Sequence, residues 1–285
     1  MFVVAGVTGH VGSVVAQQLL AQKQQIKVIV RDAAKGKRFS DAGAEVAVGS
    51  LDDAAFVTGA LKGAAGFFAM LPIDPSAPSV FAAQRKTSDA IAAAVKASGV
   101  PHVVLLSSIG ADLEAGTGPI KGLHYLEEAL RKTGAKLSAI RAGSFQENFE
   151  SSLGPARNAG IFPNFAPSAD YPIPMIATRD IGALAAQALV SPPPKSEAVD
   201  LVGPSYTYRQ VAEKLGKALG KTLQVVDVPA AAQVEAMVQG GVPRPFAVEL
   251  AEMYAGAAAG KLAPRGDRLA HGATTLDEVI RDVVG

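Results

Sequence analysis

Three glycines at a spacing of three stand near the start of the chain, in the stretch FVVAGVTGHVGSVVAQQLL. Gly6, Gly9 and Gly12 lie between an apolar run and a segment whose apolar residues recur at helical spacing. Between a strand and a helix, such glycines permit a tight turn, let a pyrophosphate approach bare backbone and let the helix pack closely on the sheet. The free N–H groups and the positive dipole end of the helix favour phosphate. The spacing predicts a dinucleotide site, to which Thr8 can add a hydroxyl donor; the alternative is a plain turn.

A second chemical signal comes at the end of the next apolar run, which reads VIVRD. In a dinucleotide-binding unit this position contacts the adenosine ribose, and an acid there favours NAD. Arg31 instead offers a guanidinium suited to a 2′-phosphate, and Lys35, Lys37 and Arg38 add positive charge nearby. We therefore expect NADPH to be preferred over NADH. In the alternative, Arg31 is a solvated surface charge and Asp32 contacts the ribose.

The elements that must position these residues alternate between strand and helix through the first half of the chain. The predicted strands cover 2–5, 26–30, 45–48, 66–71, 102–108 and 136–143, and the helices cover the segment after the glycines, 52–61, 82–98 and 123–132. Near-continuous apolar strands with intervening helices are typical of a parallel sheet covered on both faces. We expect residues 1–150 to form a Rossmann-type, doubly wound α/β domain that binds NAD(P).

The pattern changes in the second half of the chain. Residues 151–176 are rich in Pro, Gly, Ser and Asn, which predicts a loop. The elements predicted after it are a helix over 179–190, a strand over 198–203, a helix opened by the capping-box pair Thr207 and Gln210, a strand in LQVVDVP and helices through most of 229–258. We interpret 151–285 as a smaller α/β substrate lobe, partly interleaved with the first domain.

The composition excludes several classes of protein. The 285 residues carry a net charge of +1, without the basic excess typical of nucleic-acid binders. There are no cysteines, which excludes thiolate catalysis and thiolate metal sites, and the four histidines form no metal motif. No run reaches about 18 apolar residues, and the apolar N-terminus lacks a basic segment, so we expect neither a membrane span nor a signal peptide. The expectation is a cytoplasmic protein, without a metal, that acts on a small molecule.

Several stretches together resemble the NmrA-like branch of the atypical short-chain dehydrogenases. They are AGVTGHVG, VIVRDAAKG, LLSSIGAD, GLHYLEEALRKTG, LSAIRAGSFQENF and PMIATRDIG, in the family's order from residue 2 to about 190. That family includes NADPH-dependent quinone, dye and isoflavone-type reductases, and also regulators that sense the cofactor. The resemblance implies NADPH-dependent hydride transfer to a quinone-like or other conjugated acceptor. The alternative is an NADP(H) sensor without turnover.

The resemblance also implies a set of cofactor contacts. Those in the glycine loop and after the second strand are Gly6, Thr8, Gly9, His10, Val11, Gly12 and Arg31. Those at later strand ends are Ser50 and Leu51 beside the adenine, Met70, Leu71 and Pro72 along the middle of the cofactor, Ser107 and Ser108 near the nicotinamide, and Gly143, Ser144 and Phe145 beside the nicotinamide and the substrate cleft. Position 50 departs from the family, which often has an acid there, and a core role for Phe145 is the alternative.

The Tyr-x-x-x-Lys pair of the wider superfamily is absent. In that pair the lysine lowers the tyrosine pKa, so that the phenol exchanges a proton with the substrate oxygen. None of the five tyrosines has a lysine four residues later; after Tyr125 that position is Ala129. Quinone reduction tolerates the absence, because hydride addition leaves a delocalised phenolate that water or a weak acid can protonate. His124 is the nearest titratable candidate for a proton donor; in the alternative it only forms a local hydrogen bond, to Glu127 or Glu128.

Overall fold

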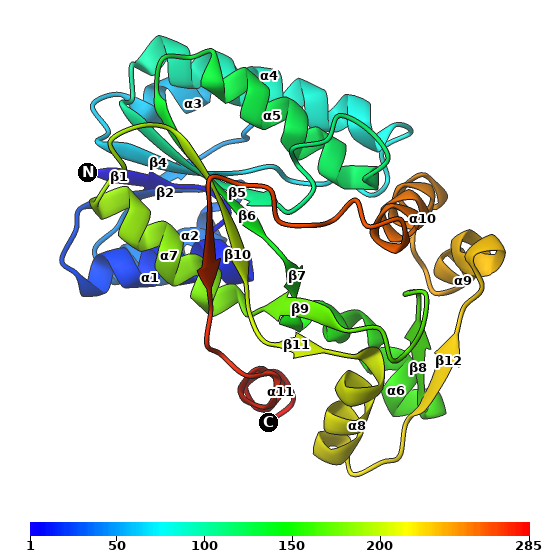
Figure 1. Cartoon of the computed structure of the whole chain (residues 1–285). Coiled ribbons are helices and arrows are strands. Elements are labelled where there is room, and N and C mark those ends of the chain that lie inside the picture. The colour runs from blue at the N-terminus through cyan, green and yellow to red at the C-terminus, as the bar shows by residue number, and fades with distance from the viewer.

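An eight-stranded sheet runs through the centre of the molecule (Figure 1). From edge to edge its strands are β13 (Arg268–His271), β10 (Glu197–Val202), β6 (Lys136–Ala142), β5 (His102–Ser108), β4 (Gly66–Met70), β1 (Phe2–Val4), β2 (Ile26–Val30) and β3 (Glu45–Val48). All neighbouring strands are parallel. The strand order extends in both directions from β1, with its switch point between β1 and β4, as in doubly wound folds. This computed structural model, which describes residues 1–285, confirms the predicted fold class.

Helices cover both faces of the sheet. On one face lie α3 (Ala54–Leu61), α4 (Val80–Ser98) and α5 (Lys121–Arg131), and on the other α1 (His10–Ala21), α2 (Ala33–Asp41) and α7 (Thr178–Val190) (Figure 1). Successive strand residues point to opposite faces, so Val103 and Leu105 join the core under α3, α4 and α5 while Val104 joins the other core. Burial on both sides explains why these strands are continuously apolar in sequence.

The second half of the chain builds a lobe and also completes the sheet. The lobe contains the small sheet β7 (Ser144–Phe145), β9 (Ile173–Ile176) and β11 (Ser205–Tyr206), the pair β8 (Ile161–Asn164) and β12 (Gln224–Asp227), and helices α6 (Leu153–Ala159), α8 (Tyr208–Leu219), α9 (Gln233–Gln239), α10 (Arg244–Ala258) and α11 (Leu276–Val284). Strands β10 and β13 lie in the large sheet, and α7 packs against α1. Segments from both halves of the chain therefore contribute to the large sheet and to the helices that cover it. The domain boundary at residue 150 stays a prediction.

Two predictions on the second half have clear outcomes. The capping box at the start of α8 is confirmed, with the Thr207 hydroxyl accepting from the Gln210 N–H and the Gln210 side chain accepting from the Thr207 N–H. The predicted loop over 151–176 is wrong, because that segment contains α6, β8 and β9. Strand β8 pairs with β12, more than 60 residues later in the chain, so its partner could not be recognised locally.

The segment from α10 to β13 is fastened to the loop that follows β5 and to the start of α5. Lys121 Nζ lies 2.8 Å from Glu249 Oε2 on α10, and Arg265 Nη1 lies 3.2 Å from Asp112 Oδ2. Gly118 has a φ of +58°, and a Cβ there would collide with the Glu249 carbonyl. The loop after β5 is therefore held in one position by the C-terminal part of the chain.

His102, at the start of β5, is buried in its neutral form. Its residue is 2% exposed, Nε2 lies 3.0 Å from the Ser138 Oγ, and Nδ1 has no partner. Burial, together with the nearby Lys136 charge, lowers the pKa of His102 to about 4. An unfolded histidine titrates near 6.5, so the unfolded chain binds more protons than the folded one between these values.

We therefore expect the free energy of unfolding to fall as the pH falls from about 6.5 towards 4. The loss from this one ring reaches about 3 kcal/mol at pH 4. Urea unfolding at a series of pH values measures it, and His102→Gln removes this ring's contribution to the slope. An equally steep pH dependence in the variant would contradict the assignment.

Candidate cofactor site

Six strands present their carboxyl ends side by side at one edge of the sheet. Because β3, β2, β1, β4, β5 and β6 are parallel neighbours, the residues that follow them meet along that edge. In this order the edge carries Ser50 and Leu51, then Arg31, the glycine loop, Met70 with Leu71 and Pro72, Ser107 with Ser108, and Gly143 with Ser144 and Phe145. Ligands of open α/β sheets bind at this edge, across the switch point. The fold brings the candidate cofactor residues together; their contacts with a cofactor stay a prediction.

A tight turn joins β1 to α1. The Gly9 N–H donates to the Gly6 carbonyl at 3.0 Å, which closes a four-residue turn around Val7 and Thr8. Gly6 has a φ of +68°, in the left-handed region that glycine adopts without strain. A Cβ on Gly12 would collide with the Gly6 carbonyl. Two of the three glycines are therefore required by the turn and by the close approach of α1.

The third glycine borders free hydrogen-bond donors. Gly9 is the N-cap of α1, and no side chain caps the helix. The first backbone bond of the helix runs from the Ser13 N–H to the Gly9 carbonyl, so the N–H groups of His10, Val11 and Gly12 precede it. A Cβ on Gly9 would meet only the Gly6 carbonyl, at 3.6 Å, which is an ordinary contact. The uncapped N-terminus of α1 thus lies beside a glycine whose lack of a side chain is not required by the packing of the chain. Both features suit the binding of a pyrophosphate.

The side chains of the same loop differ in whether they can contact a bound ligand. Thr8 and His10 are exposed, and the His10 Nε2 lies 3.4 Å from Glu150 Oε1. Val11 is 5% exposed and packs in the core with α7. Val11 can therefore contact a ligand only through its backbone.

At the end of β2 the two neighbouring charged residues have different roles. The Asp32 carboxylate accepts from the Ala34 N–H at 2.9 Å and caps α2. Arg31 is exposed, and its guanidinium has no partner in the chain. Lys37 pairs with Asp41 at 2.8 Å. Arg31 is therefore a cation without a partner in the chain at the end of β2, while Asp32 is occupied in the helix cap.

The middle of the edge is supported from beneath by apolar side chains. Leu51 and Leu71 are 9% and 7% exposed and belong to the core under α3, α4 and α5. Met70 is partly buried, and a Cβ on Gly6 would lie 2.8 Å from its Cγ. Ser50 is partly exposed and lowers the pKa of Asp52 through a side-chain hydrogen bond. Leu51, Leu71 and Met70 therefore pack beneath this part of the edge, and the Ser50 side chain is hydrogen-bonded to Asp52.

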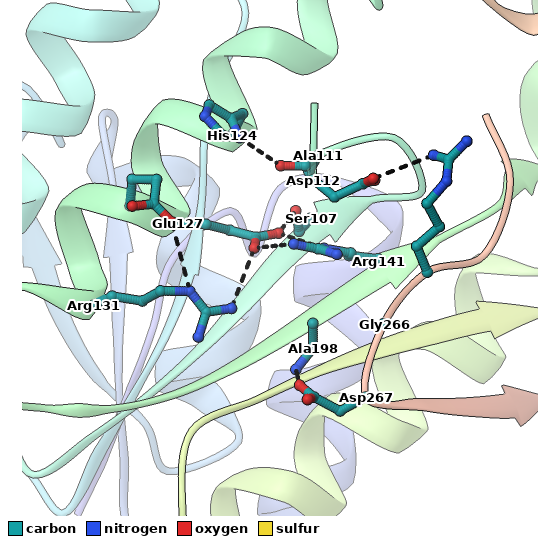
Figure 2. Close-up of polar contacts among 12 residues, drawn as sticks. Ser107, Ala111, Asp112, His124, Glu127, Arg131, Arg141, Ala198, Gly266 and Asp267 are labelled. Carbon is teal, nitrogen blue, oxygen red and sulfur yellow. Dashed lines mark hydrogen bonds and ion pairs between the residues drawn. The ribbon is translucent and has the colours of Figure 1, made fainter. Parts of the chain in front are cut away.

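A buried ion pair lies under the end of β5 (Figure 2). The Ser107 hydroxyl donates to Glu127 Oε1 at 2.6 Å, while Arg141 donates from Nε at 3.0 Å and from Nη2 at 2.7 Å to the same carboxylate. Glu127 is 2% exposed and Arg141 is 7% exposed. Burial alone would lower the pKa of Arg141, but the hydrogen bond and charge of Glu127 raise it. The Arg141 guanidinium thus stays charged against Glu127, and the Ser107 hydroxyl is committed to the same carboxylate.

His124 lies one turn before this pair on α5 and points toward the loop after β5 (Figure 2). Its Nδ1 donates to the Ala111 carbonyl at 2.9 Å; because a carbonyl only accepts, Nδ1 carries the proton and Nε2 is the nitrogen left for chemistry. The alternative, a local hydrogen bond of His124, is present, but its partner is neither Glu127, which points inward to Arg141, nor the exposed Glu128. A main-chain oxygen takes their place.

The phenols of Tyr125, Tyr208 and Tyr254 are held by a hydrogen bond or by burial. Tyr125 donates to Asp89 Oδ1 at 2.7 Å, on the outer side of α5. Burial raises the pKa of Tyr208, with a contribution from Tyr254, and burial also raises the pKa of Tyr254. Both shifts oppose the lowered pKa that a catalytic tyrosine needs near neutral pH.

A cavity of about 350 Å³ opens beside the N-terminus of α1. Its walls include His10 from the glycine loop, Glu147 and Glu150 from the turn after β7, Arg179 from α7 and Asp282 from α11. The sequence did not connect Glu147, Glu150, Arg179 and Asp282 with the glycine loop, because these residues follow it by more than a hundred positions. Their spacing in the sequence matches no motif that would indicate a shared site. Neither in this cavity nor elsewhere in the chain do three His, Asp or Glu side chains cluster as a metal site would require. No helix has the length and apolar character of a membrane span.

Known proteins match almost the whole chain. The model of the NmrA-like family matches residues 1–278. The NAD(P)H azoreductase of Xenophilus azovorans is 29% identical over 256 residues, which are 90% of this chain and 86% of that protein. The (4-alkanoyl-5-oxo-2,5-dihydrofuran-3-yl)methyl phosphate reductase of Streptomyces griseus is 29% identical over 228 residues, 79% of this chain and 76% of that protein.

Solved structures share the fold at lower identity. The Escherichia coli NADPH-dependent quinone oxidoreductase QOR2 complexed with NADPH superposes with a TM-score of 0.83 at 24% identity, with all of both chains covered. The Citrobacter triphenylmethane reductase complexed with NADP(H) gives 0.81 at 23% identity, with 99% of both chains covered. The resemblance seen in the sequence motifs is confirmed over nearly the full length, and the chain belongs to the NmrA-like family.

Proposed function

We propose that this protein is an NAD(P)H-dependent oxidoreductase that passes a hydride to a quinone-like or other conjugated small molecule, with NADPH as the preferred cofactor. The observation that carries the proposal is the uncapped N-terminus of α1 behind the Gly6–Gly9 turn, at the switch point of the sheet. Membership of the NmrA-like family supports it. So do the names of its relatives, which include an NAD(P)H azoreductase and an NADPH-dependent quinone oxidoreductase.

The cofactor, when bound, supplies the hydride. The residues of the chain bind the cofactor, orient it against the acceptor and shield both from water. The glycine loop would hold the pyrophosphate, and Ser108, Gly143, Ser144 and Phe145 at the ends of β5 and β6 would border the reacting end. The loop after β5, fastened by Lys121 and Arg265, would exclude water from one side. A conjugated acceptor suits this site because it needs no strong protein acid. The Ser107 hydroxyl is bonded to Glu127, and burial raises the pKa of Tyr208.

The direct test incubates the pure protein with NADPH and a panel of quinones, azo dyes and enones, and follows the loss of NADPH absorbance. We expect turnover with at least one class of acceptor. No turnover with any of them, together with tight binding that discriminates NADP⁺ from NADPH, would instead support a cofactor sensor.

Cofactor preference is tested at Arg31. Arg31→Ser removes the free guanidinium, so we expect NADPH binding to weaken roughly ten- to a hundredfold while NADH binding changes little. Titration of both cofactors measures the ratio. Lys37→Gln is the matched control, because Lys37 is already paired with Asp41. An unchanged ratio in Arg31→Ser would remove Arg31 from 2′-phosphate recognition.

We propose His124 as the proton donor. With Nδ1–H held by the Ala111 carbonyl, Nε2 donates from the imidazolium form of the ring. His124→Ala should lower kcat by up to about a hundredfold and leave cofactor affinity unchanged. Equal turnover in the variant and the parent would show that His124 only holds the loop.

A further inference from the structure

Arg38 contacts the glycine loop directly. Its Nη2 donates to the Val7 carbonyl at 3.0 Å, a contact that spans 31 residues of sequence. The guanidinium also lies over the Phe39 ring, 4.6 Å from its centroid. The sequence suggested only that Arg38 adds positive charge near a 2′-phosphate. The observed contact points instead to a task on the loop that would hold the pyrophosphate.

The packing of α2 brings Arg38 to this position. Phe39 is 2% exposed and belongs to the core shared with α1. A Cβ on Gly36 would lie 2.7 Å from Val46 Cγ1, so the glycine lets α2 pack close to β2 and β3. Asp32 caps the first turn of the helix. Arg38 can therefore contact the loop because all of α2 is packed in this position against the sheet.

The carbonyl that Arg38 binds belongs to the central peptide of the Gly6–Gly9 turn. In a four-residue turn this peptide, here between Val7 and Thr8, can rotate while the ends stay in place; turn types I and II differ in its orientation. The peptide is planar and trans, so its C=O and N–H point in opposite directions. Holding the Val7 carbonyl toward α2 directs the Thr8 N–H away from α2. That N–H has no partner in the chain.

We propose that Arg38 is a positioning residue for the dinucleotide pyrophosphate. It holds the Val7–Thr8 peptide in one orientation, so that the Thr8 N–H joins the free N–H groups at the start of α1 as a phosphate donor. The inference rests on the proposed function, because it assumes that a dinucleotide binds at this edge. It assigns Arg38 to the part of the cofactor that NADH and NADPH share, whereas Arg31 is assigned to the 2′-phosphate.

Four ligands separate these roles in binding titrations. NADPH carries both groups, NADH and ADP-ribose carry the pyrophosphate without the 2′-phosphate, and adenosine 2′-monophosphate carries a 2′-phosphate without the pyrophosphate. Arg38→Gln should bind NADPH, NADH and ADP-ribose roughly tenfold more weakly and adenosine 2′-monophosphate as before. Arg31→Ser should weaken NADPH and adenosine 2′-monophosphate and leave ADP-ribose unchanged. Lys37→Gln, one position before Arg38, should leave all four unchanged.

Two outcomes overturn the inference while the parent protein still binds dinucleotides. One is an Arg38→Gln variant that loses affinity only for the two ligands with a 2′-phosphate; the other is a variant that binds all four normally. Arg38→Lys keeps a hydrogen-bond donor, so it should bind NADPH, NADH and ADP-ribose more tightly than Arg38→Gln does. A purely structural defect would not explain such a recovery. If Arg38→Gln fails to fold, the same four ligands are titrated against Arg38→Lys and compared with the parent protein. A parent protein that binds neither NADPH nor NADH overturns the proposed function, and this inference with it.

Discussion

Gly9→Ala is expected to abolish tight dinucleotide binding without disturbing the fold. A Cβ at Gly9 meets only one atom of the chain, the Gly6 carbonyl oxygen at 3.6 Å, and the Gly9 φ of −98° suits alanine. The new methyl group would occupy the space in which a pyrophosphate approaches the backbone. We expect NADPH and NADH to bind at least about a hundredfold more weakly, which corresponds to about 2.7 kcal/mol, with the midpoint of thermal unfolding nearly unchanged.

Gly12→Ala supplies the contrast in the same loop. Its Cβ would collide with the Gly6 carbonyl, which is backbone and cannot move aside alone. We expect this variant to lose about 1–3 kcal/mol of stability or more, together with cofactor binding. Thermal unfolding and NADPH titration of both variants separate the two effects. A Gly9→Ala protein that binds NADPH normally would show that no phosphate lies against this glycine.

The residues that meet at the carboxyl edge could be predicted from the sequence because their signals are local. Gly6, Gly9 and Gly12 occupy one turn, and most strands that end at the edge are near-continuous apolar runs. Once the strands are taken as parallel, their ends must meet, so Arg31 and Ser108 follow without any knowledge of side-chain contacts. All predicted elements of the large sheet exist, with ends within about two residues of the observed ones.

The elements that were missed have weaker local signals. Helix α2 is short and polar, and only its cap at Asp32 and the apolar spacing of Gly36 and Phe39 mark it. Strand β13 is an edge strand with mostly exposed residues, and its pairing with β10 joins segments about 70 residues apart. Such elements form because a partner already exists in the folded chain, which no local pattern shows.

The missed functional contacts are tertiary for the same reason. Arg38 was visible as a charge, but its distance to Val7 depends on how α2 packs. Glu127 stands beside Glu128 in the sequence, and nothing in GLHYLEEALRKTG says which carboxylate is buried until the register of α5 on β6 is known. That difference between two adjacent glutamates is itself open to experiment.

Glu127→Gln should destabilise the protein by about 3–5 kcal/mol, because it leaves the buried Arg141 guanidinium without the carboxylate that it binds through two hydrogen bonds. Glu128→Gln, on the exposed side of the same helix, should change stability by less than about 0.5 kcal/mol. Urea unfolding of both variants measures the difference. Replacing both members of the pair, Glu127→Met with Arg141→Met, should recover much of the loss, since removing a buried pair costs less than breaking it. Equal stability of the two single variants would mean that Glu127 and Arg141 do not form this buried pair in solution, and that the Ser107 hydroxyl is free to serve the acceptor site.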